Sequence, residues 1–170
     1  MKLCVIGLGY IGLPSAVFFA SHGLHVHGVD IDLERIEKIK KKEIYVEETG
    51  LKEMMTAVLD NGSLTVSDKP VEADFFLLAV PTPVSPLKSA NLDYVIRAAE
   101  MIVPYIRKGN LVILESTVPP LTVNNVLIPI LKQARYIIGE EIFVSYSAER
   151  VLPGSLLEEL TCNDRVLPTR

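Results

Sequence analysis

The segment that most constrains the fold is a short apolar run that passes directly into a glycine-rich turn. Residues 3–12 read Leu-Cys-Val-Ile-Gly-Leu-Gly-Tyr-Ile-Gly, so three glycines stand in the pattern Gly-x-Gly-x-x-Gly. A helix-like stretch follows at once, and a second apolar run then leads to Asp30, 18 residues after Gly12. This combination is typical of a strand, a sharp turn and a helix that are followed by a second, parallel strand.

Each position of the pattern has a mechanical role in a dinucleotide-binding unit. Gly7 lets the chain turn sharply off the strand, and Gly9 lets the backbone approach a pyrophosphate, whose charge also faces the amino end of the helix. Gly12 lets that helix pack close to the sheet. Asp30 can accept hydrogen bonds from both ribose hydroxyls and would repel a 2′-phosphate, so the pattern predicts NAD in preference to NADP. A glycine turn with a purely structural purpose is the alternative, because glycines occur in many turns.

Length and composition favour an α/β domain and give no sign of nucleic-acid or membrane binding. The 170 residues are enough for one domain with a sizeable core, and 49% of them are hydrophobic whereas 6% are aromatic. The net charge is −4, and the basic residues are scattered apart from residues 38–42, which are expected on a solvated helix face. No stretch approaches the roughly 18 uninterrupted apolar residues of a membrane helix.

The start of the chain and its cysteines predict a cytoplasmic protein. Met1 runs directly into a strand, without the charged segment, long apolar span or cleavage site of a secretory signal. Cys4 and Cys162 are isolated from each other, and such cysteines in a cytosolic chain are expected to be free thiols. His25 and His27 alternate on a short strand with no further ligand at a suitable spacing, so no metal site is predicted.

Apolar runs and helix-like segments alternate from one end of the chain to the other. Near-continuous apolar strands with helices between them are typical of a parallel sheet that is covered on both faces. We therefore predict a single Rossmann-like, doubly wound α/β domain over residues 1–170, with a mainly parallel six-stranded sheet. The expected strands are residues 3–6, 25–29, 64–66, 75–80, 111–114 and 142–145, and the expected helices are residues 11–21, 33–41, 51–59, 92–106 and 121–134.

In an open α/β sheet, ligands bind outside the carboxyl ends of the strands, so the residues that follow each apolar run are candidate site residues. The fourth run leads into Val80-Pro81-Thr82-Pro83. The two prolines hold this loop extended and remove two backbone donors. They leave the hydroxyl of Thr82 available to a phosphate or a ribose.

Polar residues also follow the fifth and sixth runs, and each has a second interpretation. Ser116 and Thr117 follow the fifth run and can face a ligand, but either can instead cap the next helix, which has a proline pair near its start. Glu149 and Arg150 follow the sixth run. They can equally form an ordinary surface ion pair of little energetic consequence.

Taken together, six blocks of the sequence resemble the UDP-glucose/GDP-mannose dehydrogenase family, also called the UDP-sugar 6-dehydrogenases. Their order and spacing cover nearly the whole chain. The last block, Glu-Arg-Val-Leu-Pro-Gly, is similar to the UDP-N-acetylmannosamine dehydrogenases, whereas UDP-glucose dehydrogenases usually carry a Pro-Glu-Phe-Leu-type sequence there. The blocks are residues 5–14, 28–32, 71–74, 79–83, 114–120 and 149–154, and residues 163–166 continue the similarity.

The resemblance implies an NAD-dependent oxidoreductase that oxidises the C6 alcohol of a UDP-sugar to a carboxylate in two hydride transfers. A thiohemiacetal and then a thioester form on a cysteine between the two transfers. The resemblance also implies supporting catalytic roles for Thr117, which would help to position the catalytic water, and for Glu149, which would assist proton movement or hydrolysis near the nicotinamide. The implied cofactor-binding residues are Gly7, Gly9, Tyr10, Ile11, Gly12, Asp30, Arg35, Val80, Pro81, Thr82, Ser116, Thr117 and Glu149.

The sequence also departs from the family pattern. After a block like residues 163–165, the family continues into Gly-Gly, a long central helix and a later glycine-rich segment with the catalytic cysteine, whereas this sequence continues as Val-Leu-Pro-Thr-Arg. Cys162 lacks glycine-rich flanks and stands at the wrong place in the pattern. Residues 41–49 lack the family's usual Gly and Pro, and Ala148 stands where a Pro is common. We therefore expect the NAD-binding domain without the central helix and sugar-binding domain.

The chain alone is expected to bind NAD but not to oxidise UDP-N-acetylmannosamine, because the nucleophile is missing. The UDP-sugar is expected to bind only if the missing half is supplied. An apolar face that this half would cover is expected to drive homo-oligomerisation or another association. The alternative is a non-catalytic NAD-binding or interaction module derived from such an enzyme by truncation. The two proline-containing blocks after the fourth and fifth runs argue against a hydroxyacid or hydroxyacyl-thioester dehydrogenase.

Overall fold

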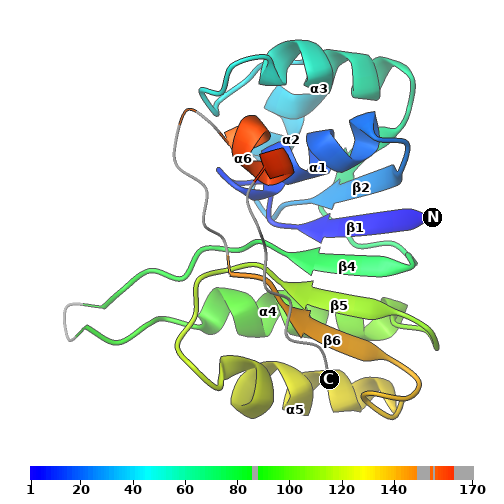
Figure 1. The fold of residues 1–170 in the computed structure, drawn as a ribbon, viewed down its shortest axis with the longest axis vertical. Coiled ribbons are helices and arrows are strands. Elements are labelled where there is room, and N and C mark those ends of the chain that lie inside the picture. The colour runs from blue at the N-terminus through cyan, green and yellow to red at the C-terminus, as the bar shows by residue number, and fades with distance from the viewer. Residues whose placement is uncertain (86–87, 149–153, 155, 163–170) are drawn as a thin grey trace.

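A computed structural model of the chain describes residues 1–85, 88–148, 154 and 156–162. In these ranges, six strands form one sheet in the order β3-β2-β1-β4-β5-β6, and every neighbouring pair is parallel (Figure 1). The predicted Rossmann-like, six-stranded sheet is confirmed. The strands are β1 (Lys2–Ile6), β2 (His25–Val29), β3 (Leu64–Ser67), β4 (Phe75–Leu78), β5 (Leu111–Leu114) and β6 (Phe143–Tyr146).

The strand order reverses between β1 and β4. The chain builds the sheet outward from β1 to β3 and then returns to place β4 on the other side of β1. Leu3 of β1 pairs with Val26 of β2 on one side and with Phe75 of β4 on the other. The connections that follow β1 and β4 therefore diverge to opposite faces, which opens a crevice at the carboxyl ends of these two strands.

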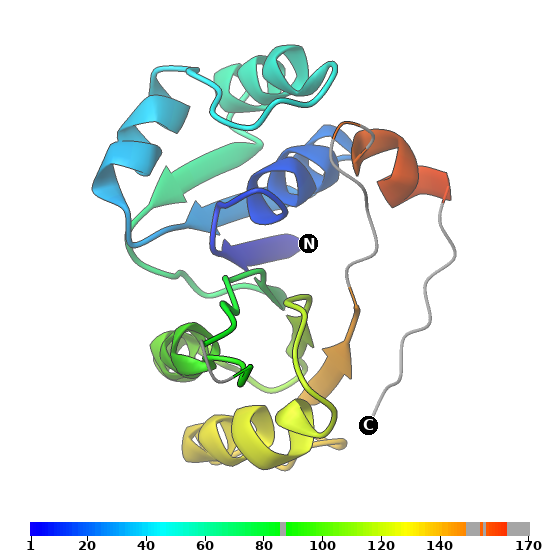
Figure 2. The same cartoon turned by 90° about the vertical axis from the view of Figure 1, so that its left-hand side faces the viewer.

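Helices cover both faces of the sheet, as predicted. Figure 2 shows α1 on one side and α4 and α5 on the other. The helical elements are α1 (Gly12–Ser21), α2 (Leu33–Lys40), α3 (Leu51–Asp60), α4 (Asp93–Ile102), the 3₁₀-helix η1 (Val103–Tyr105), the π-helical segment η2 (Val123–Leu127), α5 (Ile128–Leu131), the 3₁₀-helix η3 (Lys132–Ala134) and α6 (Leu156–Cys162).

Each face of the sheet has its own hydrophobic core. Phe76 and Leu114 belong to the core under α4 and α5, whereas Val5 and Leu77 belong to the core under α1 and α3. Phe76, Val5 and Leu114 are all 0% exposed. The alternation of these residues along the strands explains the nearly continuous apolar runs, because a strand that is covered on both faces has no polar side.

Two predicted boundaries were wrong. β4 ends at Leu78 and not at Val80, because the N–H of Val80 donates to the side chain of Ser116 and leaves the ladder. The helix expected over residues 92–106 ends at Ile102 and continues as one 3₁₀ turn that contains Pro104. A proline cannot donate the backbone hydrogen bond that would extend an α-helix.

The segment predicted as one helix over residues 121–134 is interrupted. Leu121 has a φ of 67°, so regular helix begins only after it. Pro129 has no N–H for the carbonyl of Asn125, and η2 takes the wider π-helical pattern just before this proline. The short helix α6 was not predicted from the sequence. It packs against α1, in the same layer of the molecule.

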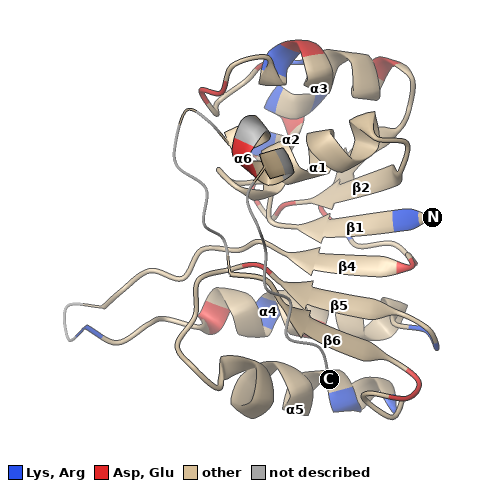
Figure 3. Cartoon of the chain, in the orientation of Figure 1, with Lys and Arg blue, Asp and Glu red and all other residues tan. Residues whose placement is uncertain are grey.

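The cysteines and the charged residues lie as the sequence indicated. Cys4 is buried and Cys162 is exposed, and both are free thiols. Figure 3 shows acidic and basic residues dispersed over helices and loops. The lysines of α2 form ion pairs on a solvated face, with Lys38 2.8 Å from Glu34. In the part of the chain that the structure describes, no helix is long and apolar enough to span a membrane.

Candidate cofactor site

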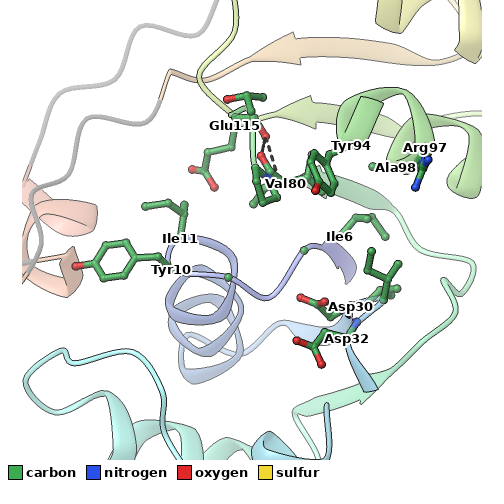
Figure 4. Close-up of a pocket in the computed structure, with 18 of the residues that line it drawn as sticks. Ile6, Tyr10, Ile11, Asp30, Asp32, Val80, Tyr94, Arg97, Ala98 and Glu115 are labelled. Carbon is green, nitrogen blue, oxygen red and sulfur yellow. Dashed lines mark hydrogen bonds between the residues drawn. The ribbon is translucent and has the colours of Figure 1, made fainter. Parts of the chain in front are cut away.

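A cavity of about 910 Å³ lies at the carboxyl ends of β1 and β4, where the strand order reverses. This is the place at which open α/β sheets bind their ligands. Figure 4 shows side chains that reach it from the turn after β1, from the end of β2, from the loops after β4 and β5, and from α4. The predicted residues that line it are Gly7, Gly9, Tyr10, Ile11, Asp30, Arg35, Val80, Pro81, Thr82, Ser116 and Thr117.

The three glycines of the turn have different surroundings. A Cβ at Gly7, whose φ is +93°, would lie 2.6 Å from the carbonyl oxygen of Ala79. A Cβ at Gly12 would lie 1.8 Å from the carbonyl oxygen of Gly7, so Gly12 is buried beneath the turn and does not line the cavity. A Cβ at Gly9 would meet no protein atom within 4 Å. Folding therefore requires glycine at positions 7 and 12, whereas position 9 is open towards the cavity.

Asp30 is 5% exposed and already accepts three hydrogen bonds from this chain. Its Oδ2 lies 2.8 Å from the backbone nitrogen of Leu8 and 2.8 Å from Nη1 of Arg35. Its Oδ1 lies 2.9 Å from the backbone nitrogen of Asp32. Because a carboxylate offers about four acceptor positions, a ribose would use the remaining position or replace Arg35. The carboxylate thus also holds the glycine turn against the end of β2.

Arg35 is fixed from three sides at the rim of the cavity. Besides Asp30, its guanidinium lies 3.9 Å from Oδ2 of Asp32 and 5.5 Å from the centre of the Tyr45 ring. The Tyr45 hydroxyl donates to the carbonyl oxygen of Leu8 at 2.5 Å. Burial raises the pKa of Tyr45, so its hydroxyl stays protonated and remains a donor. Arg35 and the glycine turn are therefore held by the loop that follows α2.

The loops after β4 and β5 are joined by side-chain hydrogen bonds. The hydroxyl of Ser116 accepts the N–H of Val80 at 3.0 Å and donates to the carbonyl oxygen of Val80 at 2.7 Å. The alternative that Ser116 caps the next helix was therefore wrong, since its hydroxyl bridges two loops. Thr82 donates its hydroxyl proton to the carbonyl oxygen of Thr117 at 2.6 Å. The hydroxyl proton of Thr82 is therefore engaged within the protein, and the acceptor positions of this oxygen remain for a donor such as a ribose hydroxyl.

Several residues of the cavity were missed by sequence reasoning. Tyr94, Arg97, Ala98 and Met101 line it from one face of α4, and Glu115, which is 4% exposed, lines it at the end of β5. Figure 4 shows Tyr94 and Arg97 on the side of the cavity that faces Asp30 and Asp32. The spacing of three to four residues on the helix after the fourth strand was a signal that could have identified the α4 residues.

No group of three His, Cys, Asp or Glu residues with a metal-binding arrangement occurs among the described residues. His27 instead lies in the sheet, with Nδ1 2.8 Å from Oγ1 of Thr65 and Nε2 2.9 Å from Oγ of Ser67. Burial lowers the pKa of His27, which favours the neutral ring. Glu149 and Arg150 lie outside the described residues.

Comparison with known proteins identifies the family. The sequence model of the UDP-glucose/GDP-mannose dehydrogenase family, NAD binding domain, matches residues 1–169. The chain belongs to this family. Because the matching model describes the NAD-binding domain of the family, the cofactor of this chain is NAD.

The chain is similar to UDP-N-acetyl-D-mannosamine dehydrogenases. It is 41% identical to that of Methanococcus maripaludis, over 98% of this chain and 38% of the relative. It is 40% identical to that of Escherichia coli, over 97% of this chain and 41% of the relative. The solved UDP-N-acetyl-mannosamine dehydrogenase Cap5O from Staphylococcus aureus superposes with a TM-score of 0.96 at 43% identity, over 99% of this chain and 42% of that chain. The chain thus spans about two fifths of the length of these relatives.

Proposed function

We propose that this chain holds NAD(H) for a UDP-N-acetylmannosamine dehydrogenase, which oxidises UDP-N-acetylmannosamine to the uronate. The observation that carries the proposal is the glycine turn. Gly7 and Gly12 are enclosed by protein atoms, whereas Gly9 is open to a cavity at the carboxyl ends of the strands. The open glycine lets a pyrophosphate approach the backbone at the start of α1.

The proposed cofactor extends across the cavity in both directions from that turn. The adenosine half lies towards Asp30 and Arg35 on one side and Tyr94 of α4 on the other. The nicotinamide half lies towards the loops after β4 and β5, which carry Thr82 and Thr117. This orientation is supported by the reversal of strand order between β1 and β4, because a dinucleotide crosses the sheet at that point in Rossmann folds.

The sugar chemistry is proposed for the whole enzyme and not for residues 1–170 alone. Thiolate catalysis requires an accessible cysteine with a thiolate at working pH. Burial raises the pKa of Cys4 to about 11, which makes it a poor nucleophile. Cys162 is exposed at the end of α6, which packs beside α1, and it is not among the described residues that line the cavity. We propose supporting roles for Thr117 at the catalytic water and for Glu149 at the proton transfer, as in the family.

Fluorescence titration tests the proposal. The purified chain should bind NADH saturably and NADPH at least about tenfold more weakly, because a 2′-phosphate would meet Asp30 and Asp32. It should not reduce NAD with UDP-N-acetylmannosamine. Absence of binding to either cofactor would refute the proposal. Reduction of NAD by the chain alone would refute the assignment of the catalytic cysteine to another part of the enzyme.

A mixing experiment separates the enzyme from a non-catalytic NAD-binding module. A polypeptide that carries the glycine-rich cysteine segment of a relative should restore oxidation of the UDP-sugar when it is added to this chain. NAD binding without any restored activity would instead favour a binding or interaction module. The cytoplasmic location expected from the sequence stays a prediction.

Self-association through exposed apolar side chains is a further part of the proposal. Phe143 is 41% exposed on β6, which is an edge strand of the described sheet, and Leu121, on the connection from β5 into η2, is 64% exposed. Exposed apolar groups beside an open strand edge favour contacts between copies of a chain. Sedimentation should detect dimers or larger species at high concentration, and a monomer at all concentrations would contradict this part.

A further inference from the structure

The loop between α2 and α3 contacts the glycine turn at two points. The Tyr45 hydroxyl donates to the carbonyl oxygen of Leu8 at 2.5 Å. Two residues further along the turn, the hydroxyl of Tyr10 donates to Oε1 of Glu48 in the same loop. Tyr10 also lines the cavity of the proposed cofactor. The loop therefore holds the turn at the backbone carbonyl of Leu8 and at the side chain of Tyr10.

Glu48 also binds the beginning of α6. The N–H of Gly154 lies 2.7 Å from Oε1 of Glu48, and the N–H of Leu156 lies 3.1 Å from Oε2. The first N–H groups of a helix have no acceptor within the helix. Glu48 supplies an acceptor from a position that precedes Leu156 by 108 residues. Figure 4 shows the Tyr10 ring extending from the turn towards this helix.

Three donors thus converge on one carboxylate: the hydroxyl of Tyr10 and the backbone N–H groups of Gly154 and Leu156. Hydrogen bonds to an ionised acceptor are roughly twice as strong as bonds between neutral groups. Burial alone would raise the pKa of Glu48, but these three bonds outweigh it and bring the pKa below its ordinary value. The carboxylate therefore stays ionised at neutral pH.

Leu156 anchors the same helix through a fully buried side chain. Its side chain is 0% exposed, and α6 packs against α1, the helix that begins at the glycine turn. Hydrogen bonds and packing consequently link three segments: the glycine turn, the loop that carries Glu48 and the beginning of α6. A ligand that restricts the movement of Tyr10 would also restrict the movement of these three linked segments.

We propose that Glu48 is a positioning residue for cofactor binding, which couples Tyr10 of the glycine turn to the beginning of α6. This inference rests on the proposed NAD(H) function. Binding of NADH orders the turn and Tyr10, and through Glu48 it stabilises the docked α6. Because coupling between two sites is reciprocal, a docked α6 also strengthens the binding of NADH.

The test compares Glu48→Gln with the wild type and with Glu47→Gln, an exposed neighbour that makes none of these contacts. The amide in Glu48→Gln would offer one oxygen to the three donors and would carry no charge. NADH should bind about tenfold more weakly to Glu48→Gln, with little change for Glu47→Gln. Tyr10→Phe should also weaken NADH binding. The fold-loss of NADH affinity in the double variant should be much smaller than the product of the fold-losses in the two single variants.

Amide hydrogen exchange distinguishes positioning from a merely structural role. In the wild type, saturating NADH should slow exchange at Leu156 and along α6, and this response should be lost in Glu48→Gln. An equal response to NADH in both proteins, or an unchanged NADH affinity in Glu48→Gln, would overturn the inference. A wild type that binds no NADH would refute the proposed function itself, and the inference with it.

Discussion

Nη1 of Arg35 lies 2.8 Å from Oδ2 of Asp30, so the carboxylate expected to bind a ribose is paired with a guanidinium from the first turn of α2. Asp30 also accepts the backbone N–H groups of Leu8 and Asp32. The acidic residue at the end of β2 therefore has two purposes. It faces the proposed adenosine position, and it fixes the glycine turn to the neighbouring strand.

Asp30→Asn should impair both purposes. An amide has one acceptor oxygen for the three donors, and its NH₂ group would face another donor. We expect the free energy of unfolding to fall by about 1–3 kcal/mol and NADH to bind at least about tenfold more weakly. Chemical denaturation and fluorescence titration measure the two effects. Asp68→Asn, at an exposed position, is the matched control, and equal behaviour of the two variants would contradict the role of Asp30.

Ser116→Ala should loosen the two loops that border the nicotinamide side of the cavity. The change removes one partner from both the N–H and the carbonyl oxygen of Val80. The net contribution of one hydrogen bond to stability is roughly 1 kcal/mol. We therefore expect the free energy of unfolding to fall by about 1–2 kcal/mol and NADH to bind severalfold more weakly. Ser63→Ala, in the turn before β3, should leave both values unchanged. Unaltered NADH affinity in Ser116→Ala would show that the hydrogen bonds between these two loops do not contribute to cofactor binding.

His27 should make the stability of the protein depend on pH. Burial lowers the pKa of His27 below its ordinary value of 6.5, so the folded state binds fewer protons at this ring than the unfolded state. The contribution of neutral His27 to the free energy of unfolding is complete above about pH 6.5 and declines as the pH falls below that value. His27→Gln should flatten this decline in melting temperature, whereas His25→Gln, at an exposed position of the same strand, should preserve it. Parallel pH profiles for wild type and His27→Gln would contradict this account.

The two thiols should differ strongly in reactivity. Burial raises the pKa of Cys4 to about 11, whereas Cys162 is exposed. Since the thiolate is the reactive form, iodoacetamide at pH 8 should modify one thiol of the native chain quickly and the second only after unfolding. Peptide mapping should place the fast adduct on Cys162. Fast modification of Cys4 in the native chain would show that β1 is more accessible than its burial indicates.

The sequence was sufficient for the sheet and for the position of the cavity. Apolar runs identify buried parallel strands, and Gly-x-Gly-x-x-Gly before a helix identifies the first turn, so the rule for open α/β sheets directs attention to the correct edge. These signals are local in the sequence. They led to Gly9, Asp30 and Thr82, all of which line one cavity.

The hydrogen bonds within the site could not be predicted in the same way. The proton of Thr82 goes to the carbonyl oxygen of Thr117, and Ser116 joins two loops, because the ends of β4 and β5 are neighbours in space. The attachment of α6 depends on Glu48, which is distant in the sequence. No residue pattern within one segment specifies such pairs, since they depend on how the segments pack.

Glycine substitutions separate folding from cofactor binding. Gly12→Ala would place a methyl group 1.8 Å from the carbonyl oxygen of Gly7, so it should destabilise the fold by several kcal/mol. Gly9→Ala meets no protein atom within 4 Å and should keep the wild-type melting temperature. Circular dichroism during thermal unfolding measures both. A large loss of stability in Gly9→Ala would show that this glycine has a structural purpose.

The most direct test of the cofactor site is a calorimetric titration of wild type and Gly9→Ala with NADH. The wild type should bind NADH saturably at one site per chain. A fully folded Gly9→Ala should bind NADH at least about tenfold more weakly, because the added methyl group would occupy the space of the pyrophosphate. Equal affinity of the two proteins, or no binding by the folded wild type, would contradict the assignment of this cavity to NAD.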